Sequence, residues 1–84
     1  MNYRDTVYFL INTFNQNHLS ECVLIDSNIH DIDPEVFSYE VTLTVNGVRV
    51  IFCNTYNSIS RSEGEQRTFK SVLNYITERA FLKL

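Results

Sequence analysis

The sequence predicts a small α+β domain with two layers in the order α-β-β-β-α, a three-stranded antiparallel sheet and both helices packed on one face. Three observations lead to this prediction. Apolar and polar residues alternate on both sides of an Asn-Gly pair between Val36 and Tyr56. Apolar residues also recur at helical spacing before and after this stretch. The chain has 84 residues, which is the length of a single domain (residues 1–84).

Asn46 and Gly47 fix the central hairpin, because both residues tolerate the positive φ angles that a two-residue type I′ turn requires. The turn places apolar residues opposite one another on one face: Val45 with Val48, Leu43 with Val50, Val41 with Phe52, and Phe37 with Tyr56. The second face pairs Thr44 with Arg49, Thr42 with Ile51, Glu40 with Cys53, and Ser38 with Thr55. A slip of one residue would invert both faces, so the agreement of turn and pattern supports this register.

The first helix is predicted from about Tyr3 to Asn15. Its apolar stripe consists of Tyr3, Val7, Leu10, Ile11 and Phe14. The opposite face carries Asp5, Phe9, Asn12 and Gln16. Phe9 is therefore either a lone exposed aromatic residue or a contact anchor for a partner or a second copy of the chain.

The last helix is predicted to begin within a turn of Glu63, because Ser60-x-x-Glu63 and Ser62-x-x-Glu65 are overlapping capping boxes. We expect Gly64 to cost little stability if this first turn frays. The apolar stripe of the helix is Phe69, Val72, Leu73, Ile76 and Ala80.

The segment before the hairpin is predicted to form a short strand and a loop. Cys22-Val23-Leu24-Ile25 is typical of a strand within Glu21–Asp26 that is covered on both faces. Ser27–Glu35 is predicted to be a polar loop, because Pro34 disfavours regular structure. Its acidic residues form either a solvated loop or a patch that meets a basic partner; they include Asp31, Asp33 and Glu35.

Composition limits the classes of function. The net charge of −3 argues against strong non-specific attraction to nucleic acid, although a local basic patch stays open as an alternative. No stretch is long and apolar enough to span a membrane, and the start Met-Asn-Tyr-Arg-Asp carries an acid, unlike a signal peptide. The separated residues Cys22 and Cys53 then predict reduced thiols in an intracellular, cytoplasmic protein, or one in the host cytoplasm if it is viral.

No pattern predicts a metal, a cofactor or catalysis. The side chains that could in principle bind zinc lack the close pairs of a zinc site; they are His18, Cys22, His30 and Cys53. Asp26-x-Asn28-x-His30 begins like a calcium loop, but Asp31 stands where Gly is needed and Phe37 where Glu is needed. The chain also has no nucleophile elbow and no phosphate-binding glycine loop, so we expect neither a cofactor nor an enzyme.

The element order resembles the double-stranded RNA-binding domain. In that family the second strand begins with Phe after a Gly-Pro-x-His loop, and here Phe37 follows Ser27-Asn28-Ile29-His30 by a longer spacer. The family's hairpin often reads Val-x-Val-Asn-Gly, which is similar to Leu43-Thr-Val-Asn-Gly47. Its last helix ends in an Ala-Leu-x-x-Leu pattern, to which Ala80-Phe81-Leu82-Lys83-Leu84 is loosely similar.

This resemblance implies binding of double-stranded RNA through contacts to phosphates and 2′-hydroxyls. The family's contacts centre on Lys-Lys-x-Ala-Lys at the start of the last helix. Alignment from the C-terminal end places Phe69, Lys70 and Leu73 at those lysines, so Lys70 alone matches. The RNA-binding residues in this interpretation are His30, Arg61, Arg67 and Lys70.

The function that the sequence favours is a small non-enzymatic interaction module that binds a macromolecule, first of all a protein. In size and composition the chain is similar to the accessory proteins with which phages and mobile elements block host systems, including anti-CRISPR proteins. The predicted contact surfaces are the outer face of the first helix (Asp5, Phe9, Asn12), the acidic loop (Asp31, Asp33, Glu35) and the outer sheet face (Thr42, Thr44, Arg49, Ile51).

Two alternatives remain open at this stage. The first is a divergent double-stranded RNA-binding domain. The second is a self-associating structural module, a homo-oligomer in which the first strand or Tyr39–Thr44 forms an open sheet edge that pairs with its twin.

Overall fold

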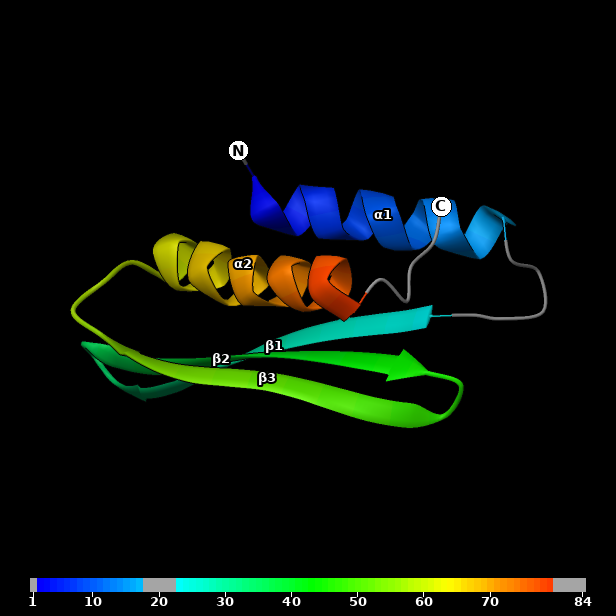
Figure 1. The fold of residues 1–84 in the computed structure, drawn as a ribbon. Coiled ribbons are helices and arrows are strands. Elements are labelled where there is room, and N and C mark those ends of the chain that lie inside the picture. The colour runs from blue at the N-terminus through cyan, green and yellow to red at the C-terminus, as the bar shows by residue number, and fades with distance from the viewer. Residues whose placement is uncertain (1, 18–22, 80–84) are drawn as a thin grey trace.

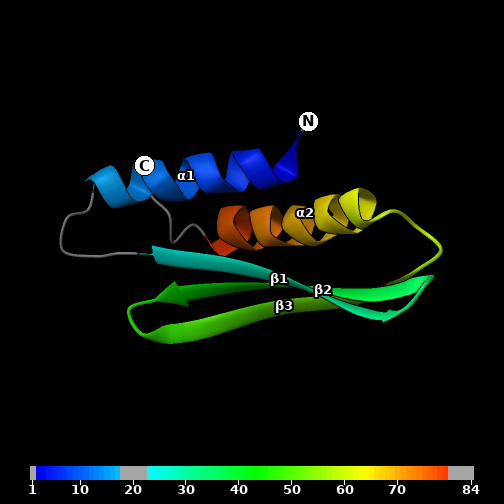
Figure 2. The same ribbon diagram turned by 180° about the vertical axis from the view of Figure 1, so that it is seen from behind.

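The computed structural model describes residues 2–17 and 23–79, which form two helices and three strands (Figure 1). In chain order these are α1 (Tyr3–Asn17), β1 (Val23–Asp33), β2 (Val36–Val45), β3 (Val48–Asn57) and α2 (Arg61–Arg79). The strands form one antiparallel sheet in the order β1-β2-β3. Both helices lie on the same side of this sheet, as the view from behind also shows (Figure 2). The predicted two-layer α-β-β-β-α fold is confirmed.

The β2–β3 hairpin has the predicted turn and register. Asn46 and Gly47 have φ angles of 52° and 81°, the two positive values that a type I′ turn requires. Val45 lies opposite Val48, and the pairing continues without interruption to Val36 opposite Asn57. Each apolar and polar pair that the sequence predicts in the hairpin is therefore present.

The core lies between the inner face of the sheet and one stripe of each helix. α2 packs against β2 and β3, and α1 packs against α2 and β1. Phe69 is fully buried, and the centre of its ring lies 6.0 Å from the ring centres of both Tyr8 and Tyr39. The other buried apolar residues are Val7, Ile11, Phe14, Val23, Phe37, Tyr39, Val41, Leu43, Val72 and Ile76.

β1 is much longer than the sequence analysis predicted. It runs through Asp33, so the prediction of a loop over Ser27–Glu35 is wrong. Ile25 and Ile29 keep the alternation of inward and outward residues going, and β2 supplies a ladder partner for each residue up to Asp31. Polar residues at every second position therefore mark the exposed face of a strand here, rather than a loop.

Pro34 follows the end of β1, and β1 pairs regularly with β2 up to a register shift between Asp31 and Asp33. Asp33 closes the turn into β2, because its Oδ1 accepts hydrogen bonds from the backbone N–H groups of Glu35 and Val36, both at 2.9 Å. The turn itself consists of Pro34 and Glu35. The proline thus restricts only the two-residue connection.

Two further expectations about the sheet are wrong. The side chain of Leu24 is 60% exposed, so the first strand is covered on one face and not on both. Tyr39–Thr44 is not an open edge, because β2 lies between β1 and β3. The sheet edges are β1 and β3.

Gly64 lets the start of α2 lie directly on the sheet. Ser60 caps the helix as predicted, since its Oγ accepts the N–H of Glu63 at 3.1 Å. Gly64 is buried, and a Cβ atom at this position would lie 2.5 Å from Cζ of Phe37 and 3.0 Å from Cδ2 of Tyr56. The glycine therefore has a packing role that the sequence analysis did not anticipate.

Replacing Gly64 with Ala should destabilise the fold by about 1–3 kcal/mol, the usual range for an overpacked core. This outcome opposes the intrinsic preference of helices for Ala over Gly, which is about 1 kcal/mol. Urea unfolding followed by circular dichroism measures the change. Ser71→Ala, at an exposed position of the same helix, is the matched control and should change stability by no more than about 0.5 kcal/mol. A stabilised Gly64→Ala protein would contradict the close packing.

Tyr39 links the sheet to both helices through polar groups. Its hydroxyl donates to Oε2 of Glu65 at 3.0 Å, and Oε1 of Glu65 lies 3.8 Å from Nη1 of Arg4. Burial raises the pKa of the Tyr39 hydroxyl; a hydrogen bond with Ser27 lowers it, and the Glu65 carboxylate raises it further.

The raised pKa of Tyr39 predicts alkaline destabilisation. Because the folded state holds this proton more tightly, its contribution to stability is complete below the unfolded pKa of about 10 and is lost as the pH rises through the folded pKa. Thermal unfolding at a series of alkaline pH values should show a falling Tm, and Tyr39→Phe should reduce the slope. Equal slopes in the two proteins would contradict this role of Tyr39.

Candidate functional site

The side of the sheet turned away from the helices, here called the outer sheet face, is the first candidate. It is formed by every second residue of each strand, and none of the helices and strands of residues 2–17 and 23–79 packs on it (Figures 1 and 2). Its residues are Leu24, Asp26, Asn28 and His30 of β1, Ser38, Glu40, Thr42 and Thr44 of β2, and Arg49, Ile51, Cys53 and Thr55 of β3.

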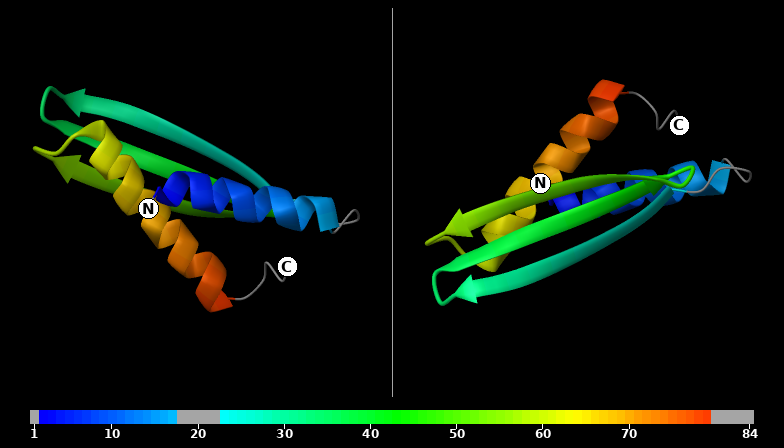
Figure 3. Two further views of the ribbon diagram at one scale, coloured as in Figure 1. Left: turned by 90° about the horizontal axis from the view of Figure 1, so that it is seen from above. Right: turned by 90° about the horizontal axis from the view of Figure 1, so that it is seen from below.

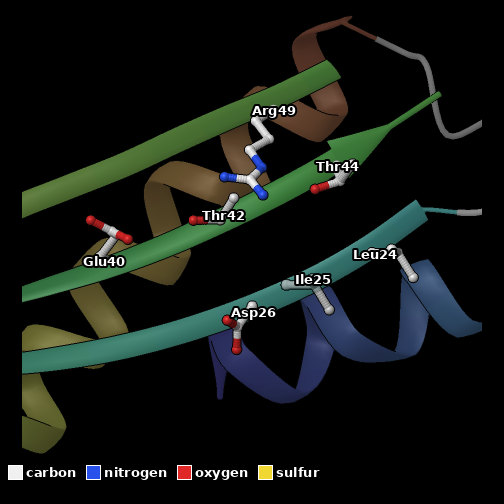
Figure 4. A pocket seen from close by; sticks show the side chains of 7 residues that line it. All are labelled: Leu24, Ile25, Asp26, Glu40, Thr42, Thr44 and Arg49. Atoms are coloured by element: carbon white, nitrogen blue, oxygen red, sulfur yellow. The ribbon is translucent and has the colours of Figure 1, made fainter. Parts of the chain in front are cut away.

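A shallow hollow of about 330 Å³ lies on this face, as Figure 4 shows from close by. Its lining residues are Leu24, Ile25, Asp26, Glu40, Thr42, Thr44 and Arg49. The short side chains of Thr42 and Thr44, both on the central strand β2, form the floor of the hollow. Ligand pockets of about 300–1,000 Å³ usually enclose most of a small molecule.

Two apolar side chains stand on either side of the threonines. Leu24 lies opposite Thr44 in the β1–β2 ladder, and Ile51 lies opposite Thr42 in the β2–β3 ladder. The side chains of Leu24 and Ile51 are 60% and 57% exposed. Exposed apolar residues grouped among polar ones are typical of the centre of a protein interface.

Charged side chains surround this apolar pair. Figure 4 shows Arg49 extending from β3 across the central strand towards Thr42, with Asp26 and Glu40 farther along the hollow. Arg49 and Ile51 are predicted contact residues, and the structure brings them together on one face with Thr42 and Thr44. The sequence analysis missed Leu24 because it treated β1 as doubly covered. The alternation of Leu24 with inward-facing Ile25 was the signal that could have identified it.

The outer face of α1 is the second candidate. Asp5, Phe9 and Asn12 are all exposed, and the Phe9 side chain is 67% exposed. The helical pattern is therefore correct here. α1 lies with α2 over the inner face of the sheet, and the outer sheet face is turned the opposite way (Figure 1). These two predicted surfaces cannot form one continuous site.

The three predicted acidic residues do not form a free loop. Asp31 lies on β1 and accepts a hydrogen bond from Nε of Arg61 at 3.0 Å, with a second contact from Nη2 of the same arginine. Asp33 is occupied by the backbone of the turn. Glu35 is exposed, and its carbonyl accepts the N–H of Ser58 at 2.9 Å. Two of the three carboxylates thus have structural partners.

The basic residues of the RNA interpretation lie on α2. Arg61 pairs with Asp31, and Nη2 of Arg67 donates to Oε1 of Glu63 at 2.8 Å. Nζ of Lys70 lies 6.0 Å from the ring centre of Tyr3. Acidic partners therefore offset the charge of both arginines.

His30 does not join this group. It lies on β1, not in a loop as expected, and its side chain belongs to the outer sheet face, where Nε2 is 3.2 Å from Nδ2 of Asn28. The residues Arg61, Arg67 and Lys70 are on the helix that covers the opposite face. The structure does not bring His30 into one surface with Lys70.

Within residues 2–17 and 23–79, no three His, Cys, Asp or Glu side chains lie close enough to hold a metal ion. Cys53 is an exposed free thiol, while His18 and Cys22 lie outside the described residues. None of the helices in the described part of the chain combines the length and apolar character needed to cross a membrane.

Comparison with protein-family models, with curated protein sequences and with solved structures finds no match to this chain.

Proposed function

We propose that this chain is a non-enzymatic protein-binding module and that its outer sheet face binds the partner. The observation that carries the proposal is the joint exposure of Leu24 and Ile51 on this face: Leu24 lines the hollow, and Ile51 lies opposite Thr42, which also lines it. A sheet is normally apolar on the face that it buries and polar on the face that it exposes. Large apolar residues on the exposed face are therefore accounted for by a partner that covers them.

The energetic argument rests on these two side chains. Complete burial of one Leu or Ile side chain contributes roughly 1.5–3 kcal/mol. Because Leu24 and Ile51 are exposed on the same face, a partner that covers this face buries both side chains. Asp26, Glu40 and Arg49 then provide charges at the rim, which orient the partner more than they increase its affinity.

A specific form of this proposal is an inhibitor carried by a phage or mobile element that blocks a host system inside the cell, as anti-CRISPR proteins do. Such an inhibitor acts by covering a surface of its target. It needs an accessible face and a stable fold, and it needs no catalytic groups.

Binding of double-stranded RNA is the weaker proposal. It is supported by the element order α-β-β-β-α, which is also that of the double-stranded RNA-binding domain. The charge pairs of Arg61 and Arg67 and the position of His30 on the other side of the sheet argue against it. An RNA surface depends on cations that are available to phosphates.

Charge substitutions on the outer sheet face test the protein-binding proposal. Leu24→Asp and Ile51→Asp should each weaken the partner complex by at least about 2 kcal/mol, the size of an interface hot spot. Their free energy of unfolding should change by less than about 0.5 kcal/mol, because both sites are exposed. The tagged protein is first used to isolate the partner from a lysate of its host, and titration calorimetry with the purified partner then gives the affinities.

Phe9→Asp is the matched control, because Phe9 is similarly exposed but lies on α1. It should bind the partner as the unaltered protein does. Loss of binding with Phe9→Asp, and unchanged binding with Leu24→Asp and Ile51→Asp, would move the site to α1 and overturn the proposal.

The RNA alternative is tested by the fluorescence anisotropy of a labelled RNA duplex at low and at physiological salt. We expect no saturable binding at either salt concentration. Salt-sensitive binding that Lys70→Glu weakens for every duplex sequence would instead favour the RNA-binding function.

A further inference from the structure

The two edges of the sheet differ in how they are closed to another strand. An edge strand presents unpaired backbone N–H and C=O groups, which pair with a further strand unless charges, a bulge, a proline or a covering segment prevents it. β1 forms one edge and β3 the other. The contrast between them points to a second kind of binding surface.

The β1 edge is protected near both of its ends. At Val23, Nδ2 of Asn15 donates to the carbonyl oxygen at 2.9 Å, and Oδ1 of Asn15 accepts the N–H at 2.8 Å. The amide of Asn15 thus takes the place of a neighbouring strand. At the other end the register shifts between Asp31 and Asp33, and Arg61 binds Asp31 beside this irregularity.

Among residues 2–17 and 23–79, no side chain caps the β3 edge along Val48–Asn57 and no register shift interrupts it. Its pairing with β2 is regular over the whole strand. Arg49 is the only charged residue of the strand, which contains neither Gly nor Pro. Most of its residues are β-branched or aromatic, the types that favour strands. β3 is therefore a regular template for one more strand.

The hairpin turn determines which backbone groups face this edge. A two-residue turn closes on a hydrogen-bonded pair, here Val45 and Val48, and bonded and non-bonded pairs alternate from there. The even-numbered residues of β3 therefore bond to β2. The N–H and C=O groups that point to the free edge belong to Arg49, Ile51, Cys53 and Thr55.

We propose that the β3 edge binds an extended peptide segment of another protein by strand addition. The recognition is by main-chain hydrogen bonds, so the proposal goes beyond the side-chain contacts of the outer sheet face. The segment carries apolar residues at every second position, because half of its side chains lie beside Val48 and Phe52 on the inner face. Val48 is 65% exposed, and Phe52 is half-buried. The centres of the Phe52 and Tyr75 rings are 5.3 Å apart.

The position of α2 favours a single extended segment, rather than a second copy of the chain, as the occupant of the β3 edge. α2 runs diagonally over the sheet, and its C-terminal half passes beyond β3 in both views of Figure 3. If two copies paired β3 with β3 about a twofold axis, both α2 helices would extend over the shared edge from the same side. A single extended segment brings no helix with it and lies beneath α2.

The test uses a synthetic peptide with the sequence of β2, Val-Phe-Ser-Tyr-Glu-Val-Thr-Leu-Thr-Val, two added lysines for solubility and a fluorophore. Binding is followed by anisotropy, and amide hydrogen exchange is followed by NMR on the labelled protein. We expect saturable binding, with exchange slowed at least about tenfold for the amides of Arg49, Ile51, Cys53 and Thr55. The amides of Val50 and Phe52 should not change. Absence of this protection at saturating peptide would overturn the proposal.

Cys53→Pro and Cys53→Ala form a matched pair of variants. Both remove the thiol, but only proline removes the N–H that points to the free edge, a position at which edge strands tolerate it. Cys53→Ala should bind the peptide normally, and Cys53→Pro should bind about tenfold more weakly. If Cys53→Pro does not fold, Cys53→Lys replaces it in the test. A lysine on an edge strand discourages pairing with a further strand, so this variant should also bind the peptide more weakly. Equal peptide affinities of the folded variants would contradict strand addition.

Two further results separate this proposal from its competitors. Leu24→Asp should leave peptide binding unchanged, because Leu24 lies on the opposite edge strand. Equilibrium sedimentation without peptide should give the monomer mass at every concentration. A concentration-dependent mass together with protection of the same four amides would make a second copy the occupant and would overturn the proposal.

Discussion

The register of the β2–β3 hairpin is the constraint on which the rest of this structure depends. Asn46 and Gly47 take positive φ angles, and the turn that they form assigns every following residue to one face of the sheet. The inner face receives Phe37, Val41 and Leu43, which the helices then cover. The same register places Ile51 outside and directs the backbone of alternate β3 residues to the free edge. Core, outer face and edge are thus set by two residues.

The packing of α2 on the β2–β3 hairpin forms the hydrophobic core of the domain. Phe69 fills the space over the sheet, and Gly64 allows the first turn to contact Phe37 directly. Tyr39 connects β2 to Glu65, and Glu65 lies near Arg4 of α1. The helices cover only one side of the sheet, so the apolar residues on its other side remain available to a partner.

The hairpin and both helices could be predicted because their signals are local: an Asn-Gly turn, an alternating pattern and capping boxes. The extent of β1 could not be predicted, because the polar residues after Asp26 are typical of a loop. Only their pairing with β2 shows that they belong to a strand. The packing role of Gly64 depends on where α2 lies on the sheet. For the same reason, the sequence could not show that His30 and Lys70 are on opposite sides of the sheet.

We propose the outer sheet face as the main binding surface and the β3 edge as a separate one. The most direct measurement of the first claim is methyl NMR of the protein in complex with its purified partner. We predict that the methyl signals of Leu24, Ile51 and Thr42 shift together, because Leu24 and Thr42 line the same hollow and Ile51 lies opposite Thr42 on the same face. Shifts confined to residues of the helices, with the signals of Leu24 and Ile51 unchanged, would contradict it.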